Sequence, residues 1–214
     1  LFIKGTPARE VLDIKQIWPT QQYQPNFSQI LADDVYFPPV AFNTLDSAKS
    51  FKIRSAITGH GQQGEFIPRT HFIKANDQNF ERSVWKACGK NPVYPQGGTW
   101  IYDRAGWCPG MATDLAEYEI SDVSGGDVIT LDYGIANGEG DSRYIVNNQI
   151  VSYGEYNHGY DLGIVDIMEP SNKVEHALNN PMCINPKMKV VNNGVNTVNS
   201  ITIEYWVNDP SNKR

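Results

Sequence analysis

The sequence lacks the uninterrupted apolar run of about 20 residues that a membrane-spanning helix requires, and no basic segment followed by an apolar one opens it. It also lacks an excess of positive charge, because 18 Lys and Arg residues stand against 24 Asp and Glu residues, for a formal net charge of −6. A chain of this charge is a poor match for a nucleic-acid backbone or an anionic membrane surface. We therefore expect a soluble protein without a membrane span and without a nucleic-acid partner.

Motifs of several reaction classes are also missing. The sequence contains no Gly-x-Ser-x-Gly elbow, no P-loop and no dinucleotide-binding fingerprint. His60 and His71 are eleven residues apart, which is not a spacing that metal ligands share, and Cys88 and Cys108 have no neighbouring Cys-x-x-Cys or histidine partner. We therefore expect neither a metal nor another cofactor.

The 214 residues are enough for one large domain or two small ones, and 40% apolar residues are enough for a buried core. The 18 Gly and 13 Pro residues, together with clusters of Asn, punctuate the chain at short intervals. This pattern is typical of an all-β chain with many loops. The segment 16–43, which contains Asp33 and Asp34, is interpreted as a surface connection.

Short runs of alternating apolar and polar residues predict strands. The runs cover residues 51–57, 70–75, 128–135, 142–151, 162–168, 187–191 and 200–207. Within 142–151, Asn147-Asn148 predicts the tight turn of a hairpin, since asparagine tolerates the positive φ of such turns. The best helix candidate is 79–88, where Phe80, Val84 and Ala87 have helical spacing.

Three cysteines allow one disulfide and one leftover thiol. Cys88 and Cys108 are the natural pair, because both lie in a loop-rich stretch, and a bridge would place the protein in an oxidising compartment. Three reduced thiols in a cytosolic protein are the alternative.

The densest group of chemically interesting residues lies in 57–111. Glu65 follows a glycine-rich loop, where an apolar environment would raise its pKa toward that of a general acid, although a solvated loop acid is the alternative. Arg104 stands between Trp100 and Trp107, and an arginine beside flat aromatic faces is typical of a carbohydrate site. The alternative is that both tryptophans are core residues and that Arg104 pairs with Asp103.

The order of these residues resembles the C-terminal half of the peptide-N-glycosidase F family, over about four fifths of the chain. The matching residues are Gly59-His60-Gly61, Glu65, Arg69-Thr70-His71, Cys88, Asn91-Pro92, Trp100 and the unusual run Asp103-Arg104-Ala105-Gly106-Trp107-Cys108-Pro109-Gly110-Met111.

The resemblance implies two packed antiparallel jelly rolls, of which this chain forms the second. It also implies a secreted, periplasmic or cell-surface bacterial amidase that uses no cofactor and cleaves the amide between an N-linked glycan and asparagine. In that reading the catalytic residues are Glu65 and Arg104, and the substrate-binding residues are His60, Arg69, Trp100 and Trp107. The resemblance further implies a disulfide between Cys88 and Cys108.

The sequence departs from the family at two places. Gln63 and Ile67 flank Glu65 where the family has two cysteines, and nothing in residues 1–50 resembles the motif of the family's principal catalytic aspartate. We therefore expect a fragment that is inactive alone, with residues 1–7 as the last strand of a missing N-terminal half and residues 1–170 as the C-terminal jelly roll. Residues 171–214 resemble a linker and the first strands of an immunoglobulin-like module, in which Cys183 has no partner.

Two other functions remain open. A non-catalytic jelly roll that binds glycan or protein could keep the scaffold without the chemistry. A copper monooxygenase would share the two-jelly-roll architecture, but the paired-histidine and methionine ligand motifs of those enzymes are missing.

Overall fold

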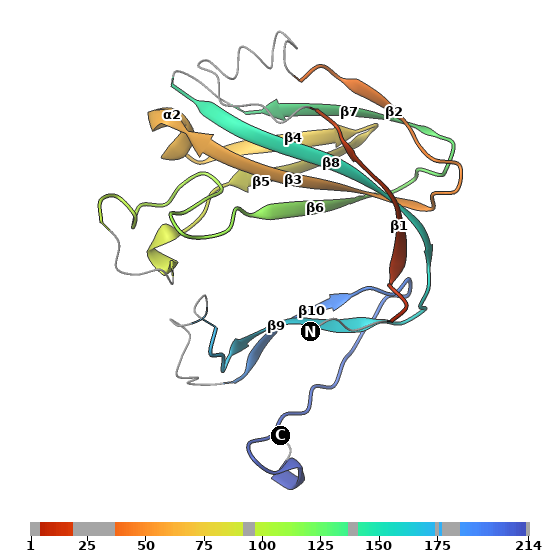
Figure 1. Cartoon of the computed structure of the whole chain (residues 1–214), viewed down its shortest axis with the longest axis vertical. Coiled ribbons are helices and arrows are strands. Elements are labelled where there is room, and N and C mark those ends of the chain that lie inside the picture. Colours follow the sequence, from red (N-terminus) through yellow and green to blue (C-terminus); the bar gives the residue numbers. More distant parts are fainter. Residues whose placement is uncertain are drawn as a thin grey trace.

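The computed structural model describes residues 5–18, 37–91, 97–136, 141–173, 176 and 185–212 of the chain. Two four-stranded antiparallel sheets pack face to face, with strand orders β1-β8-β3-β6 and β2-β7-β4-β5 (Figure 1). A separate two-stranded sheet pairs β9 with β10. The all-β class expected from the sequence is therefore confirmed.

The strands are β1 Arg9–Gln16, β2 Val40–Asn43, β3 Ser50–His60, β4 Arg69–Ala75, β5 Gln78–Val84, β6 Leu115–Ile120, β7 Val128–Ile135, β8 Arg143–Tyr156, β9 Leu162–Glu169 and β10 Lys187–Asn192. The short helices are α2 Gly61–Glu65, η1 Cys88–Lys90 and η3 Pro210–Asn212. No helix in the described ranges is long and apolar enough to cross a membrane.

The core lies between the two larger sheets and follows directly from the alternation along the strands. In β3, Phe51, Ile53 and Ile57 point inward and are buried, whereas the residues that alternate with this face are only partly covered. Ile129 and Leu131 of β7 face them from the opposite sheet as members of the same apolar cluster. Alternating side chains on a pleated strand reach opposite faces, which is why this pattern predicted β3 and β7 correctly.

The predicted helix over 79–88 is wrong, because residues Gln78–Val84 form β5 and pair with β4. Phe80 and Val84 are four residues apart, so they share one face of a helix and equally one face of a strand. Their pairing with Ile73 and Arg69 across the sheet decides between the two structures.

The predicted hairpin turn at Asn147-Asn148 is also wrong. β8 runs without interruption for 14 residues and pairs with β1 on one side and β3 on the other. Asn148 lies opposite Ser55 in this pairing. Hydrogen bonding on both edges of a central strand outweighs the turn preference of two asparagines.

Most of segment 16–43 lies outside the described residues, including Asp33 and Asp34. Several of its described residues are exposed, as the surface interpretation expects, but two aromatic residues next to the undescribed stretch are buried. Trp18 and Phe37 are 3% and 1% exposed, and the Trp18 Nε1 donates to the Pro38 carbonyl oxygen at 2.8 Å. These two aromatic rings pack edge to face and close one end of the core.

The two-stranded sheet lies below the sandwich, and the chain reaches it at the end of the long β8 (Figure 1). The predicted strands over 162–168 and 187–191 are confirmed as β9 and β10. The predicted strand over 200–207 is wrong, because these residues pair with no other strand in the described part of the chain. Cys183 lies outside the described residues, and the division into 1–170 and 171–214 stays a prediction.

Candidate active site

The candidate site lies where β3 ends and the chain turns into α2. Gly59 is required here, because a Cβ atom at this position would lie 1.9 Å from the Gly64 carbonyl oxygen. The Gly59 amide donates to the Ala105 carbonyl at 2.9 Å, and the Ala105 amide donates to the Glu65 carbonyl at 2.9 Å. Two segments that are about 40 residues apart in sequence are thus joined through their backbones. Their backbones can approach this closely because Gly59 has no side chain.

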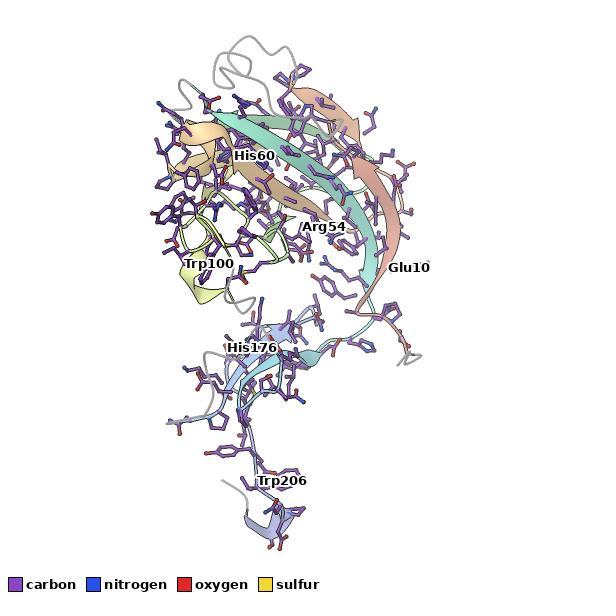
Figure 2. The ribbon with its side chains drawn as sticks, turned by 60° about the vertical axis from the view of Figure 1, so that its left-hand side comes forward. Glu10, Arg54, His60, Trp100, His176 and Trp206 are labelled. Carbon is purple, nitrogen blue, oxygen red and sulfur yellow. A yellow bond between two sulfur atoms is a disulfide. The ribbon has the colours of Figure 1, made fainter. Side chains whose placement is uncertain are left out.

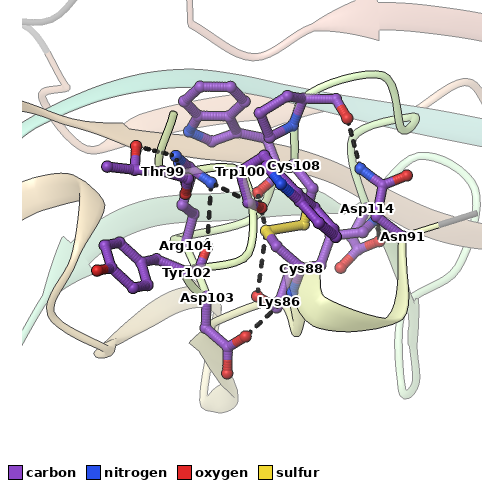
Figure 3. The surroundings of a disulfide bond; sticks show 12 residues. Lys86, Cys88, Asn91, Thr99, Trp100, Tyr102, Asp103, Arg104, Cys108 and Asp114 are labelled. Atoms are coloured by element: carbon purple, nitrogen blue, oxygen red, sulfur yellow. Dashed lines mark hydrogen bonds and ion pairs between the residues drawn. A yellow bond between two sulfur atoms is a disulfide. The ribbon is translucent and has the colours of Figure 1, made fainter. Parts of the chain in front are cut away.

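A disulfide between Cys88 and Cys108 ties the loop that carries Arg104 to η1 (Figure 3). The bond that the resemblance implied is therefore present. Lys86 and Arg104 exchange two backbone hydrogen bonds of 2.7 and 3.0 Å, and the Asp103 carboxylate accepts from the Cys88 amide at 3.0 Å. The loop is consequently fixed at both ends.

Arg104 is the centre of this loop and is only 3% exposed. Its Nε donates to the Glu65 Oε1 at 2.7 Å. Its Nη1 donates to the carbonyls of Tyr102 at 3.0 Å and Trp100 at 3.4 Å, and its Nη2 donates to the carbonyl and hydroxyl of Thr99 at 2.8 and 2.9 Å. The guanidinium has five N–H groups, so every one of them has an acceptor within the chain. Arg104 pairs with Glu65 and not with Asp103.

Two aromatic rings cover the guanidinium. Its Cζ lies 5.3 Å from the ring centres of both Phe66 and Trp107. The Trp107 Nε1 donates to the Gly59 carbonyl at 3.0 Å, which fixes the indole against the end of β3. Desolvated cation–π contacts of this kind strengthen an ion pair by excluding water from it.

The His60 ring stacks on Trp107, and the two ring centres are 5.7 Å apart. Its Nε2 lies 2.9 Å from the Thr58 hydroxyl. Burial lowers the pKa of His60, and the negative charge of Glu65 opposes this effect only in part. His60 is therefore a neutral ring at pH 7.

An open groove of about 620 Å³ lies beside the Glu65–Arg104 pair. Its lining residues include Gln62, Phe66, Trp85, Ile101 and Tyr102. Ile101 and Tyr102 are about half exposed at its rim. Thr99 and the Asp103 carboxylate complete the lining, so the groove offers apolar and aromatic faces together with polar groups, which suits the CH faces and hydroxyl groups of a sugar.

A family model of peptide-N-glycosidase F, C terminal, matches residues 26–153. The chain belongs to this family. It is 30% identical over 118 residues to the peptide-N(4)-(N-acetyl-beta-D-glucosaminyl)asparagine amidase F of Elizabethkingia miricola, a match that covers 47% of this chain and 33% of that protein.

Solved structures of peptide-N-glycosidase F have the same fold. Recombinant peptide:N-glycanase F matches with a TM-score of 0.59 at 22% identity, and PNGase F from Flavobacterium meningosepticum, titled a glycosylasparaginase, matches with 0.58 at 22% identity. Each match covers 71% of this chain and 55% of the solved chain. The chain thus spans about half of these structures, and the predicted antiparallel jelly-roll sandwich is confirmed.

In this peptide-N-glycosidase F domain, Glu65, Arg104, His60 and Trp107 lie together, as expected from the resemblance. Trp100 joins them through its backbone carbonyl, and Figures 2 and 3 show its position on the loop below the sandwich. The structure gives no contact between Arg69 and this group. The Arg69 side chain donates instead to the side chain of Gln63, two residues before Glu65, at 3.3 Å. The substrate-binding roles of these residues stay predictions.

Two residues beside the pair were missed by sequence reasoning. Phe66 directly follows Glu65, and this adjacency was a usable signal. Trp85 had no such signal, because the prediction placed it in the helix that is absent. Among the described residues, no group of three or more His, Cys, Asp and Glu side chains is arranged to hold a metal ion.

Proposed function

We propose that this chain is the C-terminal jelly roll of an amidase that hydrolyses the bond between an N-linked glycan and its asparagine, with water as co-reactant and with aspartate and the glycosylamine of the glycan as products. The observation that carries the proposal is the Glu65–Arg104 pair, held at 2.7 Å beside an aromatic groove in a member of the peptide-N-glycosidase F family. The natural substrate is then an N-glycoprotein, whose sugar lies along the groove.

A carboxamide is a poor electrophile, so its hydrolysis requires an activated water and a group that stabilises charge on the amide or the leaving sugar. Glu65 supplies the second requirement in this proposal. Its Oε1 accepts from Arg104, its Oε2 has no hydrogen bond from the described residues, and its side chain is 19% exposed. The free oxygen is thus available to accept an N–H or O–H of the bound glycopeptide.

Arg104 acts through Glu65 and not on the sugar itself. All five of its N–H groups are occupied by the chain, so it has no donor left for a ligand. We assign it a positioning role: it fixes the rotamer of Glu65 and the fold of residues 99–104. This assignment replaces the direct contact with substrate that the family resemblance suggested.

The water-activating carboxylate belongs, in this proposal, to the other jelly roll of a two-jelly-roll parent. The chain alone is then inactive, because it presents Glu65 without a partner acid. The parent is secreted, periplasmic or exposed at the cell surface, which is consistent with the disulfide between Cys88 and Cys108.

The deciding experiment compares Glu65→Gln with the unmodified sequence in a protein that contains both jelly rolls. Loss of the carboxylate is expected to lower amide cleavage by at least about tenfold. Cleavage is measured by mass spectrometry as conversion of glycosylated asparagine to aspartate. Glu119→Gln, which removes an acid paired with Arg9 away from the site, is the matched control and should remain active.

Full activity of Glu65→Gln would contradict the assignment of the site. Binding of released glycan by the unmodified protein without any cleavage would favour the alternative of a non-catalytic glycan-binding module.

A further inference from the structure

A second cluster of polar residues lies inside the sandwich, separate from the candidate active site. Arg69 and His71 share the inward face of β4, and Arg82 of β5 is the direct cross-strand partner of His71. Among the arginines that the structure describes, Arg9, Arg54, Arg104 and Arg143 form ion pairs with carboxylates, but Arg69 and Arg82 form none. Two positive charges therefore enter the space between the sheets without an acidic partner among the described residues.

Arg82 crosses this space toward the opposite sheet. Its Nη2 reaches the Ser55 carbonyl oxygen of β3 at 3.4 Å, and its Nε is buried without a hydrogen-bond partner in the part of the chain that the structure describes. Figure 1 shows β3 and β5 on facing sheets. The contrast with Arg104, whose five N–H groups are all satisfied, indicates that the Arg82 site has unused donor capacity.

Further buried polar side chains lie on the strands that Arg82 pairs with or reaches. Ser55 and Asn148 are cross-strand partners in β3 and β8, and each is 1% exposed. Neither the Ser55 hydroxyl nor the Asn148 side-chain amide has a hydrogen-bond partner among the described residues. His71 is 2% exposed, and its Nε2 is unpaired while its Nδ1 lies 2.7 Å from the Tyr133 hydroxyl. When the Tyr133 phenol donates to Nδ1, the His71 Nε2 carries a proton and becomes another donor without an acceptor.

We propose that the interior of the sandwich binds one small monatomic anion, of the size and chemistry of chloride, between Arg82 and the side chains of Ser55 and Asn148. The guanidinium supplies the charge and the Nε–H, and the Asn148 Nδ2 supplies a neutral donor. The Ser55 hydroxyl rotates to donate either to the anion or to the Asn148 Oδ1. Arg69 adds a second positive charge to the same face, which favours an anion over a water molecule.

This inference does not depend on the proposed amidase function, because none of these residues contacts Glu65. The direct test is to crystallise the chain with sodium bromide in place of sodium chloride and to measure anomalous diffraction. We expect an anomalous peak within hydrogen-bonding distance of the Arg82 Nε. If no anomalous peak appears there and the ordinary electron density shows only a water molecule, the proposal is overturned.

A solution measurement gives an independent test. The midpoint of thermal unfolding is compared in sodium chloride and in sodium gluconate at equal ionic strength, because gluconate is too large for the site. Binding to the folded state alone should raise the midpoint in chloride by roughly 3 °C for a chain of this size. The chloride effect should disappear in Arg82→Gln and persist in Arg54→Gln, which removes an arginine that is already paired with Glu117.

Equal midpoints of the unmodified chain in the two salts would refute the proposal. So would a chloride effect of the same size in Arg82→Gln. Because the bromide experiment uses the unmodified chain, the proposal remains testable even if Arg82→Gln does not fold.

Discussion

The buried histidine of β4 makes the stability of this protein depend on pH in a defined direction. His71 packs edge-on against Tyr144 at 4.6 Å and lies 2.7 Å from the Tyr133 hydroxyl through its Nδ1. Burial, together with the positive charges of Arg82 and Arg69, lowers the pKa of His71 from 6.5 to about 3. The folded protein therefore keeps this ring neutral throughout the mildly acidic range.

The magnitude follows from the difference between the two states. Above pH 6.5, the ring is neutral in both the folded and the unfolded chain, so it adds no pH dependence. Below pH 6.5, only the unfolded chain takes up the proton, and the free energy of unfolding falls by about 1.4 kcal/mol per pH unit. The loss reaches about 2 kcal/mol at about pH 5 and ends near the folded pKa of about 3.

Urea unfolding followed by tryptophan fluorescence measures this loss between about pH 7.5 and pH 5, above the range in which most carboxylates titrate. His71→Gln is expected to be less stable than the unmodified chain at neutral pH but to lose much less stability on acidification. His158→Gln, at a partly exposed histidine outside the buried core, is the control and should keep the original slope. His60, whose pKa burial also lowers, contributes a residual slope of the same sign. Equal pH slopes in His71→Gln and the unmodified chain would refute the reasoning.

Three further predictions concern the loop that carries the site. Arg104→Lys removes the planar guanidinium that donates to five acceptors and should lower the free energy of unfolding in urea by about 3 kcal/mol. An unchanged free energy of unfolding would contradict this prediction. Gly106→Ala should destabilise by more than about 2 kcal/mol, because its φ is +76° and a Cβ would lie 2.0 Å from a β3 carbonyl oxygen. Gly97→Ala, which meets nothing within 4 Å, is its control and should change stability by less than about 0.5 kcal/mol. Replacing Cys88 and Cys108 together by alanine opens a loop of sequence separation 20 and should lower the free energy of unfolding in guanidinium chloride by about 3 kcal/mol. An unchanged unfolding midpoint would show that the disulfide does not stabilise the fold.

The sequence was informative where one physical signal dominated. Alternation along residues 51–57 and 128–135 predicted β3 and β7, because one face of each strand is buried and the other is not. Residues 79–88 misled because Phe80 and Val84 have a spacing that helix and strand share. Asn147 misled because pairing with two neighbouring strands is a long-range property that local turn preference does not contain.

The candidate site shows the same division. The unusual run from Asp103 to Met111 located the loop and, through the family resemblance, the disulfide. The pairing of Arg104 with Glu65 joins residues 39 positions apart, so sequence spacing alone favoured the adjacent Asp103 equally well. Whether a guanidinium has donors left for a ligand depends on the loop carbonyls of residues 99–102, whose direction no sequence pattern encodes.

The small sheet of β9 and β10 has a practical consequence for the behaviour of the protein at high concentration. Ile164 and Val165 are neighbours in β9, so they point to opposite faces, and they are 61% and 54% exposed. Neither face of this sheet is therefore fully covered by the described residues, and each of its strands has a partner on one edge only. The edges β5 and β6 of the sandwich are instead joined by paired hydrogen bonds between Gln78 and Ser121. Self-association of concentrated protein should accordingly begin at β9 and β10 by strand addition, leaving the jelly roll and its groove intact.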